Sequence, residues 1–509
     1  MILIHPPVVK PCEPPAGLAR LSGALSRHKV KHKVLDANLE ALLYLMNNRM
    51  SQDPRTTDRW TSRAFRDLTK NVASLKEWKI YNSIDRYKRA VIDLNHAVEM
   101  SADSGFTIGL SDLHHNGLSP LKSEDLIRAA EHPEQNPFYH YFRRRLSGLV
   151  REMSGTLAGF SLNYLSQALC TFAMAGFLKK EFHGISIVLG GGLVTSWMRN
   201  PKWSNPFSGL VDHLVSGPGE HQLLSIVGIE DVNGENFTPG YDNLPLNDYL
   251  SPGPVLPYSA SSGCFWGKCS FCPESAEDNP YIPIAVEQVA SDLDILIEKI
   301  NPVLVHLLDN SVNTVLLKRI AEAPLHIPWY GFARITTLLT DIDFCRALKR
   351  SGCVMLKLGL ESGDQKVLDG MQKGIDLKTA SLALKTLKKA GIATYVYLLF
   401  GTPEETLSEA RKTLEFVVRH KDEIRYLNLA IFNMPVCGTE SGKFQTSSFY
   451  EGDLSLYTDF LHPGGWGRKQ VRRFLDNEFR RNQAVAGILR RDPPVFTSNH
   501  APFFEMKAG

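Results

Sequence analysis

The sequence lacks long hydrophobic runs and an excess of either charge. No apolar stretch approaches the roughly 18 residues that a membrane-spanning helix needs. Lys and Arg number 57 against 54 Asp and Glu, for a net charge of +3, and no basic run predicts a nucleic-acid stripe. The first residues, MILIHPPVVKPCEPP, are too short and too proline-rich for a secretory signal peptide. These absences predict a cytoplasmic protein that binds neither membrane nor nucleic acid.

Cysteine is scarce, with eight residues in a chain of 509, which excludes a disulfide framework. Five cysteines are scattered singly, at Cys12, Cys170, Cys345, Cys353 and Cys437. The other three, Cys264, Cys269 and Cys272, lie together in SSGCFWGKCSFCPE with the spacing C-x4-C-x2-C. In a reducing cytosol, clustered cysteines indicate metal or redox chemistry.

The length of the chain predicts two or more domains, and its 43% apolar and 22% charged residues are those of a globular protein. Residues 1–40 read as strand, helix and strand, and the same rhythm returns in GTLAGFSLNYL, ISIVLGGG and HLVSGPGE. We therefore expect a Rossmann or flavodoxin-like α/β domain over residues 1–240, interrupted by a polar, mainly helical insertion at 45–145. Its ligand would lie over the carboxyl ends of the strands.

A stretch rich in Pro, Gly and Asn at 235–260 predicts a linker, and a second β/α series follows. After LPYSASSG, near-continuous apolar strands are expected in PVLVHLLD, WYGFAR, VMLKLGLESG, TYVYLLFGTPEE and YLNLAIFNMP. No helix is predicted between PVLVHLLD and WYGFAR, whereas a helix ending at Gly391 precedes TYVYLLF. Roughly six units indicate a partial (β/α)6 barrel over 241–440, with a small helical cap over 441–509.

The three clustered cysteines raise the question of which metal they would hold. A structural zinc site needs four ligands, so zinc would have to borrow a distant His or Cys. A chance cluster of buried cysteines is the other alternative. Three thiolates suit a [4Fe–4S] cluster whose fourth iron stays open to a ligand. Gly263 and Gly267 would allow tight turns, Lys268 adds positive charge, and Phe271 offers an aromatic face to a flat group such as adenine.

This cysteine loop, with an aromatic residue before its last cysteine and a partial barrel after it, resembles the radical S-adenosylmethionine (SAM) superfamily. The usual spacing there is C-x3-C-x2-C, and this sequence has one extra residue. HLLDN, WYGFAR, VMLKLGLESG and YLLFGTPEET resemble the family's SAM-side strand ends. The resemblance implies cluster ligation by Cys264, Cys269 and Cys272. It implies SAM contacts at Phe271, Asp309, Asn310, Arg334, Glu361 and Ser362.

The first domain resembles the cobalamin-binding domain of class B radical SAM enzymes in PPVVKPCEPPAG, SLNYLSQAL, LGGGLVTSW and VSGPGE. The resemblance implies cobalamin contacts at Pro14, Ala16, Gly17, Ser161, Asn163, Tyr164, Gln167, Gly190, Gly191, Gly192, Gly217, Gly219 and Glu220. A degenerate Rossmann domain that binds nothing is the alternative.

One further motif, Asp112-x-His114-x-x-Gly117, matches the pattern whose histidine ligates cobalt in base-off cobalamin proteins. That motif should follow the first strand, but here it lies in the insertion. We therefore interpret it as a chance match and expect cobalamin to bind without a histidine below cobalt.

These resemblances imply a cobalamin-dependent radical SAM methyltransferase that acts on an unactivated carbon through a 5′-deoxyadenosyl radical and methylcobalamin. An external one-electron donor such as ferredoxin or flavodoxin would reduce the cluster. The substrate could be a small molecule or a protein residue, such as Gln or Arg of methyl-coenzyme M reductase.

Cobalamin-type radical cyclisation or rearrangement is one alternative, and a non-catalytic Fe–S or zinc protein is another. A methylthiotransferase is disfavoured because the first domain has no second cysteine trio. No general base is assigned, although Tyr395 and Tyr397 alternate with Val396 and could face inward.

Overall fold

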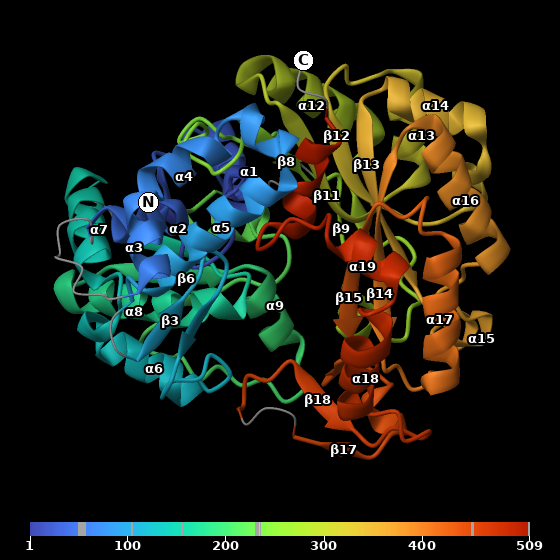
Figure 1. Cartoon of the computed structure of the whole chain (residues 1–509). Coiled ribbons are helices and arrows are strands. Elements are labelled where there is room, and N and C mark those ends of the chain that lie inside the picture. Colours follow the sequence, from blue (N-terminus) through green and yellow to red (C-terminus); the bar gives the residue numbers. More distant parts are fainter. Residues whose placement is uncertain are drawn as a thin grey trace. The chain divides into compact units, whose positions relative to one another are not determined.

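The computed structural model describes residues 1–48, 58–102, 105–153, 156–229, 234, 236–448 and 452–506. The chain folds into two compact units (Figure 1). The first holds Met1–Val255 with Tyr450–Leu456, and the second holds Leu256–Phe449 with Tyr457–Gly509. Among the described residues, no helix combines the length and apolar character that a membrane crossing requires.

A parallel five-stranded sheet forms the centre of the first unit. Its order is β2-β1-β5-β6-β7. Counted along the chain this is 2-1-3-4-5, the flavodoxin order, so the predicted fold class is confirmed. The strands are β1 (Ile2–His5), β2 (Lys33–Asp36), β5 (Leu157–Ser161), β6 (Ser186–Gly190) and β7 (His213–Leu214). The helices that follow strands in this fold are α1 (Ala16–Arg27), α8 (Leu165–Glu181), α9 (Gly192–Arg199) and α10 (Glu220–Ile226).

The segment between β2 and β5 is mainly helical, as expected for the insertion. Its elements are α2 (Ala37–Asn48), α3 (Arg59–Arg66), α4 (Leu68–Leu75), α5 (Ile84–Glu99), α6 (Ser123–Glu131) and α7 (Tyr139–Met153), with a hairpin of β3 (Phe106–Ile108) and β4 (Leu113–His115). Helix α8 approaches α6 closely at Gly176, where an added Cβ would lie 2.0 Å from the Ala130 carbonyl oxygen. This close approach explains a glycine inside a helix that is buried over most of its length.

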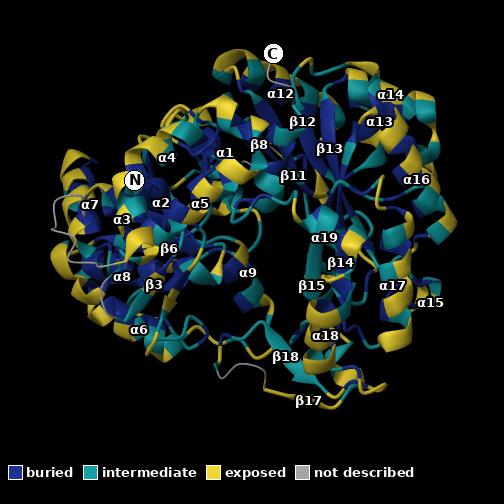
Figure 2. Ribbon diagram, in the orientation of Figure 1, coloured by how far each residue is buried: buried dark blue, intermediate teal, exposed yellow. Residues whose placement is uncertain are grey.

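The second unit is built on a six-stranded sheet of order β15-β14-β13-β12-β11-β8, and β11 to β15 pair in parallel. The strands are β8 (Val255–Tyr258), β11 (Leu304–Val312), β12 (Trp329–Ala333), β13 (Cys353–Glu361), β14 (Ala393–Phe400) and β15 (Tyr426–Ile431). Sequential order of this kind is that of the predicted partial barrel. Most residues of the strands are buried except in β15, which is largely half-buried, and exposed residues lie on the helices (Figure 2).

Helices alternate with the barrel strands: α12 (Val286–Ile300), α13 (Thr314–Glu322), α14 (Ile342–Arg350), α15 (Gln365–Gly370), α16 (Leu377–Ala390) and α17 (Leu407–Arg419). Helix α16 ends at Gly391 in the left-handed conformation, as the sequence predicts. Helix α13 was not expected, and it corrects the prediction of two strands without an intervening helix. Asn313 begins it, because its side chain accepts a hydrogen bond of 2.8 Å from the Leu316 amide.

The segments at the two predicted domain boundaries pack against the compact units. In the expected linker, the Tyr249 hydroxyl donates to Asp36 at 2.6 Å and the Gly240 amide donates to the Ala19 carbonyl at 2.7 Å. The first unit extends to Val255, which lies within the stretch of 235–260 where the linker is expected. The tail after 456 belongs to the barrel unit and contains β18 (Tyr457–Phe460), α18 (Arg468–Phe474) and α19 (Gln483–Leu489).

Candidate functional site

The cysteine loop begins at the end of β9 (Ser261–Ser262) and ends at α11 (Pro273–Ala276). Gly263 has a φ of 74°, and an added Cβ would lie 2.4 Å from the Pro280 carbonyl oxygen. Gly267 also has a positive φ, of 58°. Both glycines therefore serve the tight turns expected of them.

The three thiols of the loop are free, and Cys269 is buried whereas Cys264 and Cys272 are partly exposed. Burial raises the pKa of Cys272 to about 11. Burial also raises the pKa of Cys269, against the opposing charges of Lys373 and Arg334. The described residues contain no group of three or more His, Cys, Asp or Glu that could hold a metal ion.

Two cations lie beside the thiols, and the first of them, Lys373, was not predicted from the sequence. The Lys373 ammonium lies 5.5 Å from the Phe271 ring centroid and 2.8 Å from a Glu361 carboxylate oxygen. The Arg334 guanidinium stacks 3.7 Å from the Trp266 ring centroid. A cluster that carries three thiolates is rich in negative charge, so this donor set and its surroundings fit such a group.

Residues 371–374, which follow α15, form a platform under the cysteine loop. The Ser270 amide donates to the Met371 carbonyl at 3.1 Å, and the Trp266 indole donates to the Gln372 carbonyl at 3.1 Å. Gly374 has a φ of 63°, and an added Cβ would lie 2.3 Å from the Trp266 ring. The platform therefore fixes the loop through backbone contacts that leave no periodic signal in the sequence.

Arg334, predicted to contact a carboxylate, is anchored to the same platform. Its guanidinium donates to the Gly374 carbonyl at 3.0 Å and to the Lys373 carbonyl. Burial lowers its pKa, while the two nearby cysteines raise it. Its contacts in this structure therefore position the loop, with the charge directed toward the thiols.

The predicted residues at the end of β11 border the start of the cysteine loop. Asp309 is buried and accepts from the Ser261 hydroxyl at 2.5 Å and from the Ala260 amide at 3.1 Å. Asn310 is exposed and donates to the Gly263 carbonyl at 3.3 Å. Asp309 thus uses both carboxylate oxygens to hold the chain, whereas Asn310 lies at the surface beside Cys264.

Glu361 and Ser362, predicted as a pair of SAM contacts, point into different surroundings. Glu361 has a φ of 68°, and its carboxylate reaches Lys373 beside the cysteine loop. Ser362 is fully buried, with its hydroxyl 3.2 Å from that of Thr413 and accepting from the Asp364 amide at 3.1 Å. The structure therefore brings Glu361 to the loop, while the Ser362 side chain packs toward α17.

One face of the barrel sheet carries polar and aromatic side chains. Lys357 is buried, and its ammonium lies 2.9 Å from His306 Nε2 and 4.3 Å from the Phe332 ring centroid. Tyr395 pairs with Lys357 in the parallel register, so the two share a face, and its hydroxyl donates to Asp492 at 2.7 Å. Tyr397 contacts Phe332 on that face, with a centroid distance of 4.9 Å.

In the first unit, three predicted residues meet where β5 and β6 end. The Gly192 amide donates to Asn163 Oδ1 at 2.9 Å, and Asn163 donates to the Ser161 hydroxyl at 3.1 Å. Gly191 has a φ of 109°, and an added Cβ would lie 2.4 Å from the Leu162 carbonyl oxygen. Gly190 ends β6 just before this turn, and Gly17 of α1 lies across from Ser161.

Other predicted residues of this domain differ in exposure. Tyr164 is 59% exposed, and Ala16 is partly exposed at the start of α1. Gln167 is fully buried and instead bonds to the Tyr164 amide and the Pro6 carbonyl, so its side chain does not face the expected mouth. Pro14 is buried as well. The expectation that the Gln167 side chain faces the mouth is corrected by this packing, whereas the contact at Pro14 stays a prediction.

The last predicted turn of this domain is closed by an ion pair. Glu220 is buried at the start of α10 and pairs with Arg20 of α1. Gly217 has a φ of 74°, and its amide donates to the Thr195 hydroxyl at 2.9 Å. Gly219 precedes the helix directly, next to Val215. The turn therefore stands at the end of β7, and Glu220 ties α10 to α1.

The Asp112-x-His114-x-x-Gly117 motif lies in the β3–β4 hairpin of the insertion. His114 is 72% exposed at its side chain and lies 2.7 Å from an Asp112 carboxylate oxygen. Gly117 follows, and its amide donates to His115. The motif thus stands in an antiparallel hairpin, not in the turn after β1 that a cobalt-ligating motif would occupy.

Comparison with known proteins identifies the second unit. Residues 258–417 match the model of the radical SAM superfamily. This segment contains the cysteine loop and strands β11 to β14. The chain therefore carries a radical SAM domain, and a flavodoxin-like domain precedes it, which is the arrangement expected of class B.

Relatives and solved structures extend the comparison beyond that domain. An uncharacterised methyltransferase of Pyrococcus horikoshii is 29% identical over 297 residues, which are 51% of this chain and 63% of that protein. An anaerobic magnesium-protoporphyrin IX monomethyl ester cyclase of Rubrivivax gelatinosus is 24% identical over 40% of this chain and 44% of its own. The chain thus spans less than two thirds of the length of each of these relatives.

A solved structure shows the same fold at lower identity. It is the radical SAM methyltransferase TsrM of Kitasatospora setae, solved with cobalamin and a [4Fe–4S] cluster. Its TM-score is 0.50 at 14% identity, over 85% of this chain and 75% of TsrM. The order of a flavodoxin-like domain followed by a radical SAM barrel is therefore the fold seen in TsrM.

Proposed function

We propose that this protein is a cobalamin-dependent radical SAM methyltransferase that methylates an unactivated carbon. The observation that carries the proposal is the cysteine loop, where three free thiols lie beside Lys373 and Arg334 in a domain that matches the radical SAM model. Similarity to a methyltransferase of Pyrococcus horikoshii supports methyl transfer as the reaction class.

In this proposal Cys264, Cys269 and Cys272 hold a [4Fe–4S] cluster, and SAM lies over the loop between Phe271 and Glu361. When bound, the cluster supplies the electron for reductive cleavage of SAM, and cobalamin carries the methyl group to be transferred. Phe271 would offer its ring to the adenine, and Glu361 an acceptor to the ribose hydroxyls. The Ser362 side chain is not assigned a contact with SAM, because its hydroxyl already has two hydrogen-bond partners.

Cobalamin would bind over the strand ends of the flavodoxin-like domain, at the turns of Gly17, Asn163 and Gly192. These turns expose small side chains and backbone, which lets a large planar ligand approach. The exposed Tyr164 would border that ligand. His114 of the β3–β4 hairpin takes no part in this proposed cobalamin site, and no histidine is proposed as a ligand of cobalt.

The substrate is proposed by class, as a small molecule or a peptide containing Gln or Arg, of the kind found in methyl-coenzyme M reductase. The face of the barrel sheet that carries Lys357 and His306 would lie next to the reacting carbon. Similarity to the Rubrivivax gelatinosus cyclase favours radical cyclisation as the second candidate. Both reactions would start from the same cleavage of SAM.

The test is SAM cleavage by protein reconstituted with iron and sulfide without oxygen. Dithionite-reduced protein should release 5′-deoxyadenosine, and Cys264→Ser, Cys269→Ser and Cys272→Ser should each abolish it. Cys345→Ser, a buried cysteine on α14, is the matched control and should cleave SAM like the parent. Cleavage that survives in all three loop variants would reject the proposal. A methylated product, as opposed to a cyclised one, would distinguish the two candidate reactions.

A further inference from the structure

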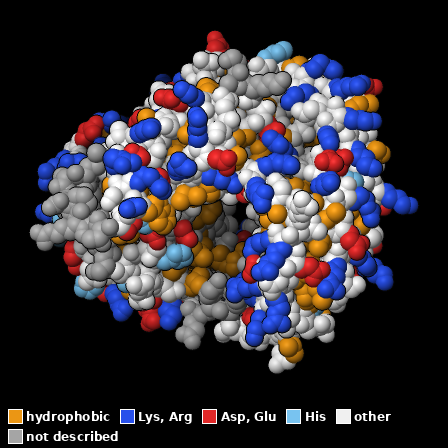
Figure 3. Space-filling model, in the orientation of Figure 1, with side chains coloured by type: hydrophobic (Ala, Val, Ile, Leu, Met, Phe, Trp, Pro, Cys, Tyr) orange, Lys and Arg blue, Asp and Glu red, His pale blue; other side chains and the backbone are white. Residues whose placement is uncertain are grey.

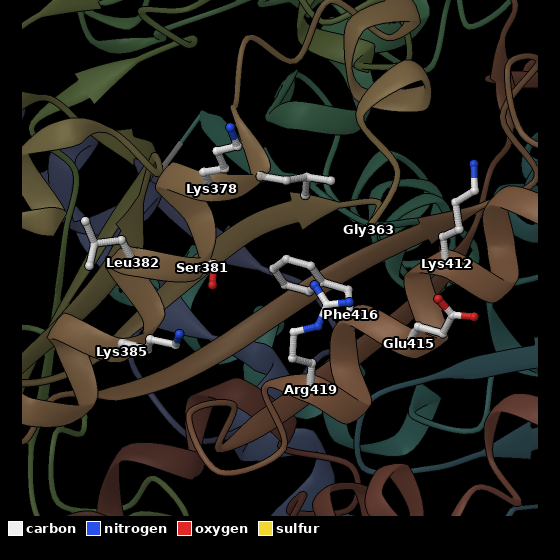
Figure 4. Close-up of a pocket in the computed structure, with 10 residues that line it drawn as sticks. Gly363, Lys378, Ser381, Leu382, Lys385, Lys412, Glu415, Phe416 and Arg419 are labelled. Atoms are coloured by element: carbon white, nitrogen blue, oxygen red, sulfur yellow. The ribbon is translucent and has the colours of Figure 1, made fainter.

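A hollow of about 530 Å³ opens on the outer side of the barrel, between α16 and α17 (Figure 4). Its walls come from one face of each helix, at spacings of three and four residues. The lining residues are Gly363, Leu377, Lys378, Ser381, Leu382, Lys385, Lys412, Glu415, Phe416 and Arg419. We call this hollow the α16–α17 groove. None of the three loop cysteines lines it.

The α16–α17 groove is strongly basic. Lys378, Lys385, Lys412 and Arg419 are exposed and line it, against the single acidic residue Glu415. Lys412 pairs with Asp364 at 2.8 Å, but the other three cations form no ion pair within the described part of the chain. Lys and Arg side chains recur along this edge of the molecule in the space-filling view (Figure 3). Three of the four cations in the groove therefore carry positive charge that no ion pair among the described residues balances.

The groove also has apolar parts. Leu382 is 51% exposed, and Phe416 forms a buried part of the wall. A protein partner could cover the Leu382 side chain while its carboxylates meet the surrounding cations. A free phosphate would use the cations alone and would leave Leu382 without a partner. The combination therefore favours an acidic protein as the occupant.

A small hydrophobic cluster connects the groove to the cysteine loop. Val367, Leu368 and Met371 form its buried centre, and both Leu377 and Phe271 pack against it. Leu377 lines the groove, and Phe271 directly precedes Cys272. Groove residue Leu377 and loop residue Phe271 therefore contact the same buried cluster of Val367, Leu368 and Met371.

We propose that the α16–α17 groove is the docking surface for an acidic one-electron donor protein of the flavodoxin or ferredoxin type. The proposal rests on the proposed function, because only a reducible cluster needs such a donor. One electron would pass from the reduced donor, which is thereby oxidised by one electron, to the cluster held by the cysteine loop. No bond or proton is exchanged. The basic walls would steer the acidic donor to the groove and hold it weakly enough for release.

The test compares reduction by a protein with reduction by a small molecule. The groove variant is K385E/R419E. The matched control is K318E/R350E, which makes the same charge change on α13 and α14. Both residues are exposed, and Arg350 is the last residue of its helix, as Arg419 is. SAM cleavage is measured with reduced flavodoxin at low salt and, separately, with dithionite. Binding of oxidised flavodoxin is measured by biolayer interferometry without any SAM.

We expect K385E/R419E to need at least about tenfold more flavodoxin for half-maximal cleavage, because two attractive charges at the docking surface become repulsive. Flavodoxin binding should weaken by the same factor. The dithionite rate should equal that of the parent, and K318E/R350E should change the flavodoxin dependence by less than about twofold.

Equal flavodoxin dependence in the groove and control variants would overturn the docking proposal, as would loss of the dithionite rate together with the flavodoxin rate. The docking proposal would also fail if the groove bound inorganic phosphate and K385E/R419E left flavodoxin binding unchanged. If the parent itself fails to cleave SAM with dithionite, the proposed function fails. The interferometry then still decides whether the groove binds the donor protein.

Discussion

Gly374→Ala tests whether the platform holds the cysteine loop as described. Alanine at a φ of 63° costs roughly 1–2 kcal/mol by itself. The new Cβ would lie 2.3 Å from Trp266, so the indole must move. Its movement breaks the hydrogen bond to Gln372, worth about 1 kcal/mol, and the Arg334 stacking, worth about 0.5–1 kcal/mol. The sum is about 2.5–4 kcal/mol.

Gly391→Ala is the matched control, because Gly391 has a φ of 76° but the nearest atom to an added Cβ is 3.8 Å away. It incurs the backbone cost alone, roughly 1–2 kcal/mol. Thermal unfolding followed by circular dichroism measures both variants. At about 2–4 °C per kcal/mol, Gly374→Ala should melt several degrees below Gly391→Ala. It should also retain less iron after reconstitution. Equal melting temperatures and equal iron content would refute the platform.

Three single contacts give further predictions. Lys373→Met removes a positive charge beside Cys269 and leaves Glu361 without its ion-pair partner, so the protein should retain less iron. Lys373→Arg keeps the charge and should retain iron, and metal analysis of the two variants checks this. Burial raises the pKa of Glu405 to about 7, so the folded state holds this proton more tightly than the unfolded state. The free energy of unfolding should therefore fall as the pH rises from the usual carboxyl range to about 7, by up to about 1.4 kcal/mol per pH unit. Glu405→Gln should flatten that dependence in melting curves, and an unchanged slope would contradict the assignment. Asn163→Ala frees the Gly192 turn and should lower the cobalt bound per chain, and unaltered cobalt would count against that turn as the cobalamin site.

Most strands of both units could be predicted from the sequence. Apolar runs such as ILIH and VMLKLGL marked buried parallel strands, and Gly391 marked a helix end. Helix α13 was missed although Asn313, a good helix-capping residue, stands at its start. It follows β11 almost directly, with only Asn313 between the end of the strand at Val312 and the start of the helix at Thr314.

The site was predictable only where residues stand close together in the chain. The cysteine spacing identified the loop, but the platform of residues 371–374 meets it through tertiary contacts that no local pattern encodes. Side-chain directions at Glu361 and Ser362 also escaped prediction, because the register of β13 shifts near Glu361 and its φ is positive. The Gln167 side chain turns inward because its oxygen caps the amides of Asn163 and Tyr164 at the start of α8, and its nitrogen donates to the Pro6 carbonyl of another turn.

The central claim is that three thiolates, not four, hold an iron–sulfur cluster in the second unit while the first binds cobalamin. The most direct measurement is the iron, cobalt and zinc content of protein purified without oxygen from cells supplied with cobalamin. We predict about four iron and about one cobalt per chain, with iron lost when Cys264, Cys269 and Cys272 are all replaced by Ala. Zinc without iron, or iron that survives the triple replacement, would contradict this claim.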